Sequence, residues 1–212
     1  MIDGRLLRAG DRGWLIECAG RRPADVAASI WRSPWASGLR EVVPAATTVL
    51  VVADDAAQME RLAVRLRGVL DQTGVHAGAE AAGEAPRTIV IPVRYGGADL
   101  EAVAERAGIE PEDVARLHSG GEHSVAFFGF APGFAYMDGL PEPLRLPRLP
   151  SPRPRVPAGV VAIAGNQTVV YPGGTPGGWH QIGVTAERLW NADAHPPNRL
   201  SVGDRVVFQA VT

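Results

Sequence analysis

The chain has 212 residues, of which 46% are hydrophobic and 21% are charged, and its formal net charge is -2. This length allows one large domain or two modest ones, each with its own core, and the composition is that of a globular protein. The small net charge provides no basic field for nucleic acid. No apolar run approaches the roughly 20 residues of a membrane helix. We therefore expect neither a nucleic-acid partner nor a membrane partner.

The basic and sulfur-containing residues restrict the chemistry further. All 21 basic residues are arginine, and the absence of lysine excludes Schiff-base catalysis and a P-loop lysine. A phosphate group would have to be bound by arginine, backbone N–H groups or a metal. Cys18 is the only cysteine, and residues 1–20 interrupt their apolar stretches with charges, unlike a signal peptide. We expect a cytoplasmic protein.

The first part of the chain predicts a small α/β sandwich domain over residues 1–80. In the helix predicted over 23–33, helical spacing places Val26, Ile30 and Trp31 on one face. In the helix predicted over 54–74, Asp54 or Asp55 can cap the N-terminus. The predicted elements are two short strands within 5–18, a helix over 23–33, a strand over 47–53 and a helix over 54–74.

A stretch with little periodicity, residues 75–86, is predicted to be a linker. The second domain would occupy 87–212, where short strands separated by turn signals are typical of a compact β-barrel or sandwich. Its predicted strands are 87–95, 124–130, 160–165, 167–172 and 204–211, and its predicted helices are 98–108 and 109–121.

Three loops of this second domain could carry chemistry. In residues 129–142, aromatic side chains stand among glycine and proline, either to contact a flat ligand or to fill the core. Residues 141–157 carry seven prolines and four arginines. Most of that run would wrap the surface in a polyproline-like conformation, but Arg153 and Arg155 could stand at the mouth of a barrel and bind an anion.

The third loop is residues 171–183, YPGGTPGGWHQIG, in which glycine and proline crowd before a tryptophan and a histidine. It could approach a ligand closely or be only a turn between strands. The segment does not open a helix, so it predicts neither a Rossmann nor a P-loop nucleotide site. The residues in or near this segment that carry hydroxyl, amide, aromatic or imidazole groups are Gln167, Thr168, Tyr171, Thr175, Trp179 and His180.

Metal and serine-hydrolase patterns are missing from the sequence. His118 and His123 are five residues apart with two glycines between them, and no set of Cys and His has zinc-ligand spacing. The motif Gly-x-Ser-x-Gly is also absent. We therefore predict no metal site and no hydrolytic triad.

The order of the motifs in residues 116–185 resembles the KipI family. The segments are RLHSGGEHSVAFFGFAPGFAYMDGLPE and PRLPSPRPRVPAGVVAIAGNQTVVYPGGTPGGWHQIG, and the openings GDRGWLIE and EVVPAATTVLVV agree in order. Its members are known as the B subunit of 5-oxoprolinase, the first subunit of allophanate hydrolase, or the first half of a carboxyltransferase domain.

The resemblance implies an α+β fold, with an N-terminal α/β sandwich followed by a C-terminal cyclophilin-like β-barrel. It also implies an ATP-dependent 5-oxoprolinase that converts 5-oxoproline to L-glutamate, with ATP and Mg bound either by this chain or by a partner subunit. The implied partners are a KipA-like protein and a LamB/YcsF-like protein, which are the C and A subunits of that enzyme. Other family activities are allophanate hydrolysis, biotin-dependent carboxyl transfer and inhibition of a histidine kinase.

The resemblance also suggests the residues of a cleft shared with the partner. We expect catalytic roles for Gln167, Tyr171 and His118. The alternative for His118, which its position favours, is a helix-terminal residue that interacts well with the helix dipole. The substrate-binding residues implied are Phe130, Gly133, Phe134, Tyr136, Arg153, Arg155, Gly165, Thr175, Gly177, Gly178 and Trp179.

Overall fold

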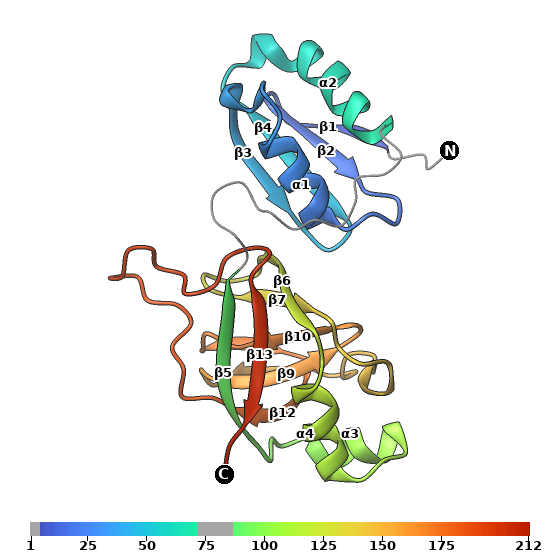
Figure 1. The fold of residues 1–212 in the computed structure, drawn as a ribbon, viewed down its shortest axis with the longest axis vertical. Helices are drawn as coiled ribbons and strands as arrows, with labels where there is room; N and C mark the ends of the chain where they lie inside the picture. Colours follow the sequence, from blue (N-terminus) through green and yellow to red (C-terminus); the bar gives the residue numbers. More distant parts are fainter. Residues whose placement is uncertain (1–4, 72–86) are drawn as a thin grey trace. The chain divides into compact units, whose positions relative to one another are not determined.

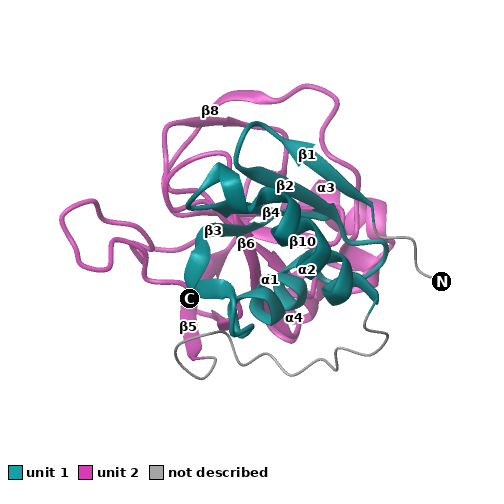
Figure 2. Cartoon of the chain, turned by 90° about the horizontal axis from the view of Figure 1, so that it is seen from above, with its two compact units in different colours: residues 1–86 teal, residues 87–212 magenta. Residues whose placement is uncertain are grey.

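A computed structural model describes residues 5–71 and 87–212 of the protein. The chain divides into two compact units, residues 1–86 and residues 87–212, which Figure 2 shows in different colours. Each unit contains its own hydrophobic core. The predicted linker, residues 75–86, lies outside the described residues.

The first unit is a four-stranded sheet with two helices (Figure 1). The strand order is β1-β2-β4-β3, and every neighbouring pair is antiparallel. Alternate residues of β4, namely Val49, Val51 and Ala53, are buried in a core shared with both helices, as a half-buried strand requires. The elements are β1 (Leu6–Ala9), β2 (Gly13–Glu17), α1 (Pro23–Trp31), β3 (Leu39–Pro44), β4 (Thr48–Ala53) and α2 (Met59–Asp71), with single 3₁₀ turns at Ala36–Gly38 and Ala56–Gln58.

The second unit is a closed seven-stranded barrel in the order β10-β7-β6-β13-β5-β12-β9 (Figure 1). Only the β5–β13 pair is parallel among its described strand pairs. Two helices, α3 and α4, contact each other and strands β12 and β13. The barrel strands are β5 (Thr88–Tyr95), β6 (His123–Phe128), β7 (Ala135–Asp138), β9 (Val160–Ala164), β10 (Gln167–Val170), β12 (His180–Val184) and β13 (Arg205–Ala210). The remaining elements are α3 (Leu100–Ala107), α4 (Pro111–Ser119), the 3₁₀ turn Glu142–Leu144, β8 (Arg153–Val156) and β11 (Thr175–Gly177).

A second hydrophobic cluster lies on the outer side of the barrel wall. Val170 of β10 belongs to the cluster inside the barrel, whereas Val169 and the following Tyr171 belong to the outer cluster. This alternation is the two-residue period of a strand. The two-stranded ribbon β8–β11 contributes Val156 to the outer cluster. The outer face of β10 is therefore buried at a place where aromatic residues gather.

The structure confirms the α+β class and the C-terminal barrel. It departs from the predicted elements in the short strands: β3, β7, β8, β11 and β12 were not predicted, because proline and glycine in or beside them suppress the strand signal. The first unit has the predicted order of strands, helix, strands and helix, and its sheet is antiparallel. Trp31, predicted to share the buried face of α1, is 38% exposed.

None of the helices in residues 5–71 and 87–212 is long and apolar enough to span a membrane.

Candidate functional site

A cavity of about 230 Å³ opens against the outer cluster of the barrel. All three walls come from segments that the sequence singled out: the turn between β6 and β7, the proline-rich run and the segment around β11. The lining residues are Phe130, Phe134, Tyr136, Arg148, Pro152, Tyr171, Pro176, Gly177, Gly178 and Trp179. We call this cavity the aromatic pocket.

The aromatic rings of this pocket pack against one another, several of them edge to face. The Phe134 ring centroid lies 5.1 Å from that of Tyr171 and 5.1 Å from that of Tyr136. Tyr136 in turn lies 5.8 Å from Trp179 and stacks on Phe127 at 4.3 Å. Such contacts hold each ring in one orientation. The pocket therefore presents fixed aromatic walls, suited to a flat and partly apolar ligand.

Tyr171 places a free polar group in this aromatic setting. Its hydroxyl has no hydrogen-bond partner among the described residues, although the residue is only 2% exposed. Burial raises the pKa of Tyr171, and the nearby Tyr136 adds to the rise, while Arg148 and Arg153 oppose it. The hydroxyl therefore stays protonated at neutral pH and can donate a hydrogen bond.

Arg148 is a pocket residue that the sequence analysis did not select. Its guanidinium carbon lies 5.4 Å from the centre of the Trp179 ring, a cation–π distance. It has no carboxylate partner among the described ion pairs. The proline-rich run contains four arginines, and no signal within it distinguishes Arg148 from the others. Arg148 is therefore the cation available to an anionic ligand in this pocket.

Phe130 stands at the rim of the pocket in an unusual backbone conformation. Its φ is 68°, in the left-handed region that non-glycine residues seldom occupy, and its side chain is 62% exposed. The turn is closed by a hydrogen bond from Gly129 N to Phe134 O at 3.1 Å. The tight β6–β7 turn thus holds an exposed aromatic ring at the opening, 5.3 Å from the Phe134 ring.

Neither of the two arginines predicted to bind an anion lines the pocket. Arg153 donates to Asp99 at 2.7 Å, and the same carboxylate accepts the Gln181 backbone N–H at 2.8 Å. One nitrogen of the Arg153 guanidinium is therefore paired with a carboxylate, whereas the other terminal nitrogen is buried and has no described hydrogen-bond partner. Arg155 is exposed and does not line the pocket.

Gln167 and Gly165 are also outside the pocket. Gln167 and Tyr171 share the outer side of the β10 segment, but four residues of extended chain separate them by about 13 Å. The Gln167 amide donates to Asp138 at 3.0 Å. Gly165 occupies the tight turn between β9 and β10, with φ 58°. The structure does not bring Gln167 together with Tyr171.

His118 points into the barrel rather than the pocket. It is fully buried, with Nδ1 2.7 Å from the Tyr95 hydroxyl and Nε2 3.1 Å from the Thr168 hydroxyl. Burial lowers the pKa of His118 well below its ordinary value, and the neighbouring His123 lowers it further. The imidazole is thus a neutral member of a buried hydrogen-bonded chain, although it stands in the last turn of α4.

The remaining predicted residues border the pocket. Gly133 lines a neighbouring cavity of about 470 Å³, which also has Tyr171 in its wall. The Gly133 φ is 75°, and a Cβ there would collide with Trp190, so only glycine fits. Thr175 pairs with Val156 in the β8–β11 ribbon, and its buried hydroxyl has no described partner. Within residues 5–71 and 87–212, no group of three or more His, Cys, Asp or Glu side chains could hold a metal ion.

Comparison with known proteins places this chain in a family. Residues 5–200 match the family described as carboxyltransferase domain, subdomain C and D. The chain is 46% identical over 129 residues to the 5-oxoprolinase B subunit of Bacillus subtilis, covering 59% of this chain and 54% of that protein. It is 48% identical over 133 residues to the protein of the same name from Escherichia coli O157:H7, covering 61% of each. The matched segments thus span a little over half the length of these relatives.

Solved structures agree with the fold. The crystal structure of TTHA0988 matches with a TM-score of 0.75 and 35% identity, over 95% of this chain and 40% of that one. PH0987 from Pyrococcus horikoshii matches with a TM-score of 0.57 and 34% identity, over 98% of this chain and 97% of that one. The urea amidolyase of K. lactis, at 19% identity, covers 99% of this chain and 15% of that one with a TM-score of 0.68, and shows the fold alone.

The fold and the family match together define a carboxyltransferase-type domain built of subdomains C and D. Within that class the chain belongs to the KipI family, whose members include proteins named as the B subunit of 5-oxoprolinase.

Proposed function

We propose that this chain is a subunit of an ATP-dependent 5-oxoprolinase, which opens the lactam ring of 5-oxoproline to give L-glutamate. The observation that carries the proposal is 45% to 48% identity with three proteins named as the B subunit of 5-oxoprolinase. Those matches cover 58% to 61% of this chain.

The chemistry of the pocket suits this substrate class. A five-membered lactam with one carboxylate is small, flat and anionic. The rings of Phe134, Tyr136 and Trp179 would contact its faces, and Arg148 would bind its carboxylate. The protonated Tyr171 hydroxyl would donate a hydrogen bond to the lactam carbonyl oxygen, which gains negative charge when the amide is attacked.

The remaining roles belong to the assembled enzyme. We propose that a KipA-like subunit completes the cleft beside Phe130, the exposed ring at the pocket rim, and that a LamB/YcsF-like subunit joins the complex. ATP with Mg would supply the energy for cleavage in that complex. In this proposal Gln167 and His118 are not assigned to the carbonyl or the carboxylate, since neither residue lines the pocket.

Reconstitution tests this function. ATP hydrolysis is measured with and without 5-oxoproline, first for this chain alone and then with its KipA-like and LamB/YcsF-like neighbours. We expect hydrolysis stimulated by 5-oxoproline, with L-glutamate as product, only in the complete mixture. A mixture that forms a complex, as judged by size-exclusion chromatography, but makes no glutamate from 5-oxoproline would refute the proposal. Urea-dependent carboxyl transfer would then be assayed.

A further inference from the structure

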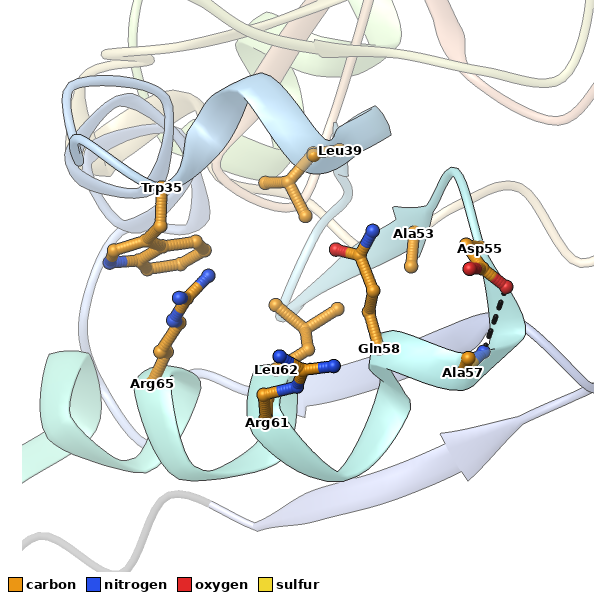
Figure 3. A pocket seen from close by; sticks show the side chains of 10 residues that line it. Trp35, Leu39, Ala53, Asp55, Ala57, Gln58, Arg61, Leu62 and Arg65 are labelled. Carbon is orange, nitrogen blue, oxygen red and sulfur yellow. Dashed lines mark hydrogen bonds between the residues drawn. The ribbon is translucent and has the colours of Figure 1, made fainter.

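A separate cavity lies in the first unit, between the start of α2 and the segment before β3 (Figure 3). Its volume is about 300 Å³, large enough for a small molecule. It shares no residue with the aromatic pocket. The side chains that matter for its chemistry are Trp35, Asp55, Gln58, Arg61, Leu62 and Arg65. We call it the arginine pocket.

The positions of the two arginines of this pocket are electrostatically unfavourable when no anion is bound. Arg61 and Arg65 stand one helical turn apart on α2, so their charges lie on the same face and repel. Arg61 is also in the first turn of the helix, where the helix dipole disfavours a cation. Both features would be offset by an anion held between the two guanidinium groups.

Neither arginine has a carboxylate partner. No ion pair among the described residues includes Arg61 or Arg65. Glu60, the acidic residue of the same turn, instead pairs with Arg8 at 3.7 Å. The acidic residue of the lining, Asp55, accepts the Ala57 backbone N–H at 2.9 Å at the far end of the cavity from Arg65 (Figure 3). The two guanidinium groups therefore keep their donors available.

Trp35 gives the pocket an aromatic surface beside these cations. The Arg65 guanidinium carbon lies 5.8 Å from the centre of the Trp35 ring, and Figure 3 shows the Arg65 side chain reaching toward that ring. Such a cation–π contact orients the guanidinium, whose planar set of N–H donors matches a carboxylate or a phosphate. Leu62 and Leu39 add apolar surface to the same cavity.

We propose that the arginine pocket binds a small organic anion, whose single carboxylate or phosphate group is held by Arg61 and Arg65 and whose body lies against Trp35. The Asp55 carboxylate at the other end selects against a second anionic group and favours a neutral or basic end. The Gln58 amide is placed to hydrogen-bond that end. This site is independent of the proposed lactam chemistry, because its binding can be measured on this chain alone.

Binding to the full chain tests the proposal through the indole N–H signal of Trp35 in NMR spectra, assigned with Trp35→Phe. The probes are inorganic phosphate, AMP and 5-oxoproline, each titrated separately. We expect a saturable shift of the Trp35 signal with at least one probe. Shifts with phosphate and AMP identify a phosphate site, and a shift with 5-oxoproline alone identifies a carboxylate site.

Three variants complete the test. Arg61→Gln and Arg65→Gln should each weaken binding at least about tenfold, because each removes one charged donor group. Arg67→Gln is the matched control, since it removes the same charge from an exposed position of the same helix outside the cavity. Glutamine keeps the helix propensity of arginine, and thermal unfolding checks that each variant is folded. The absence of a saturable shift with every probe, or an equal loss in Arg67→Gln, would overturn the proposal.

Discussion

Gly177 leaves space that the hydroxyl of Tyr171 fills. A Cβ built on Gly177 would collide with the Tyr171 Oη and with the ring carbon that bears it. The tyrosine is buried among Phe134 and its neighbours, so it cannot swing away without disturbing the outer cluster. The glycine-rich segment therefore turns the chain and also sets the position of the one pocket hydroxyl proposed to act on substrate.

Substitution of this glycine should destabilise the second unit. We expect Gly177→Ala to lower the free energy of unfolding by about 2 kcal/mol, the usual result of forcing an extra methyl group into a filled space. Gly178→Ala is the matched comparison, because a Cβ there has its nearest neighbour at 3.5 Å, an ordinary contact. Urea unfolding of both variants measures the two free energies of unfolding. Equal stabilities would show that Tyr171 does not occupy the position described.

Removal of the Tyr171 hydroxyl should affect activity and not stability. The hydroxyl makes no hydrogen bond within the described residues, so Tyr171→Phe should change the free energy of unfolding by less than about 0.5 kcal/mol. In the reconstituted enzyme we expect kcat/KM for 5-oxoproline to fall by about a hundredfold, the effect of losing one donor to a developing oxyanion. Wild-type kinetics with Tyr171→Phe would remove the hydroxyl from the mechanism.

The left-handed conformation of Phe130 should be visible as strain. Phe130→Ala and Phe130→Gly both remove the exposed ring and its contact with Phe134, but only glycine adopts a φ of 68° freely. We expect Phe130→Gly to be more stable than Phe130→Ala by about 1 kcal/mol in urea unfolding. If alanine proves as stable as glycine, the backbone of the β6–β7 turn is not in this conformation.

The buried histidines of the barrel should make stability depend on pH. Burial lowers the pKa values of His118 and His123 below 6.5, so the folded chain binds fewer protons than the unfolded chain once the pH falls below about 6.5. The free energy of unfolding should therefore fall between pH 7 and pH 5.5, while the carboxylates remain mostly ionised.

A variant separates the contribution of His118 to this pH dependence from those of other titrating groups. His118→Gln should lose up to about 1.4 kcal/mol per pH unit of that dependence, the contribution of one proton. Urea unfolding of both proteins at several pH values between about 5.5 and 7.5, the range in which histidine titrates, provides the comparison. The same slope in the variant and the wild type would mean that His118 is not held neutral in the barrel.

The sequence predicted the aromatic pocket better than the polar residues around it. Tyr171, Gly177 and Trp179 lie in one glycine- and proline-rich segment, and such a segment is visible without a structure. Their partners Phe134 and Tyr136 come from a second segment of the same kind. Each of these two segments supplies several residues to the pocket, so its aromatic wall could be predicted from two runs of sequence.

Which polar residues reach the pocket is determined by the tertiary structure. Gln167 lies only four positions before Tyr171, but extended chain carries it about 13 Å away. His118 turns into the barrel because α4 packs on β13, a contact between segments far apart in the sequence. The proline-rich run offered four arginines, and only the fold determines that Arg153 pairs with Asp99 while Arg148 reaches the pocket.

The charge of Arg148 provides the most direct test that the aromatic pocket takes part in 5-oxoproline cleavage. The measurement is 5-oxoproline-dependent ATP hydrolysis by the reconstituted mixture. The mixture contains the wild-type chain, Arg148→Gln or Arg106→Gln. Arg106→Gln is the control, because it removes an exposed charge of α3 outside the pocket. We predict that Arg148→Gln raises KM for 5-oxoproline at least about tenfold, through loss of its partner for the substrate carboxylate, and that Arg106→Gln matches wild type. Wild-type KM and kcat in Arg148→Gln, with the complex fully assembled, would contradict the account.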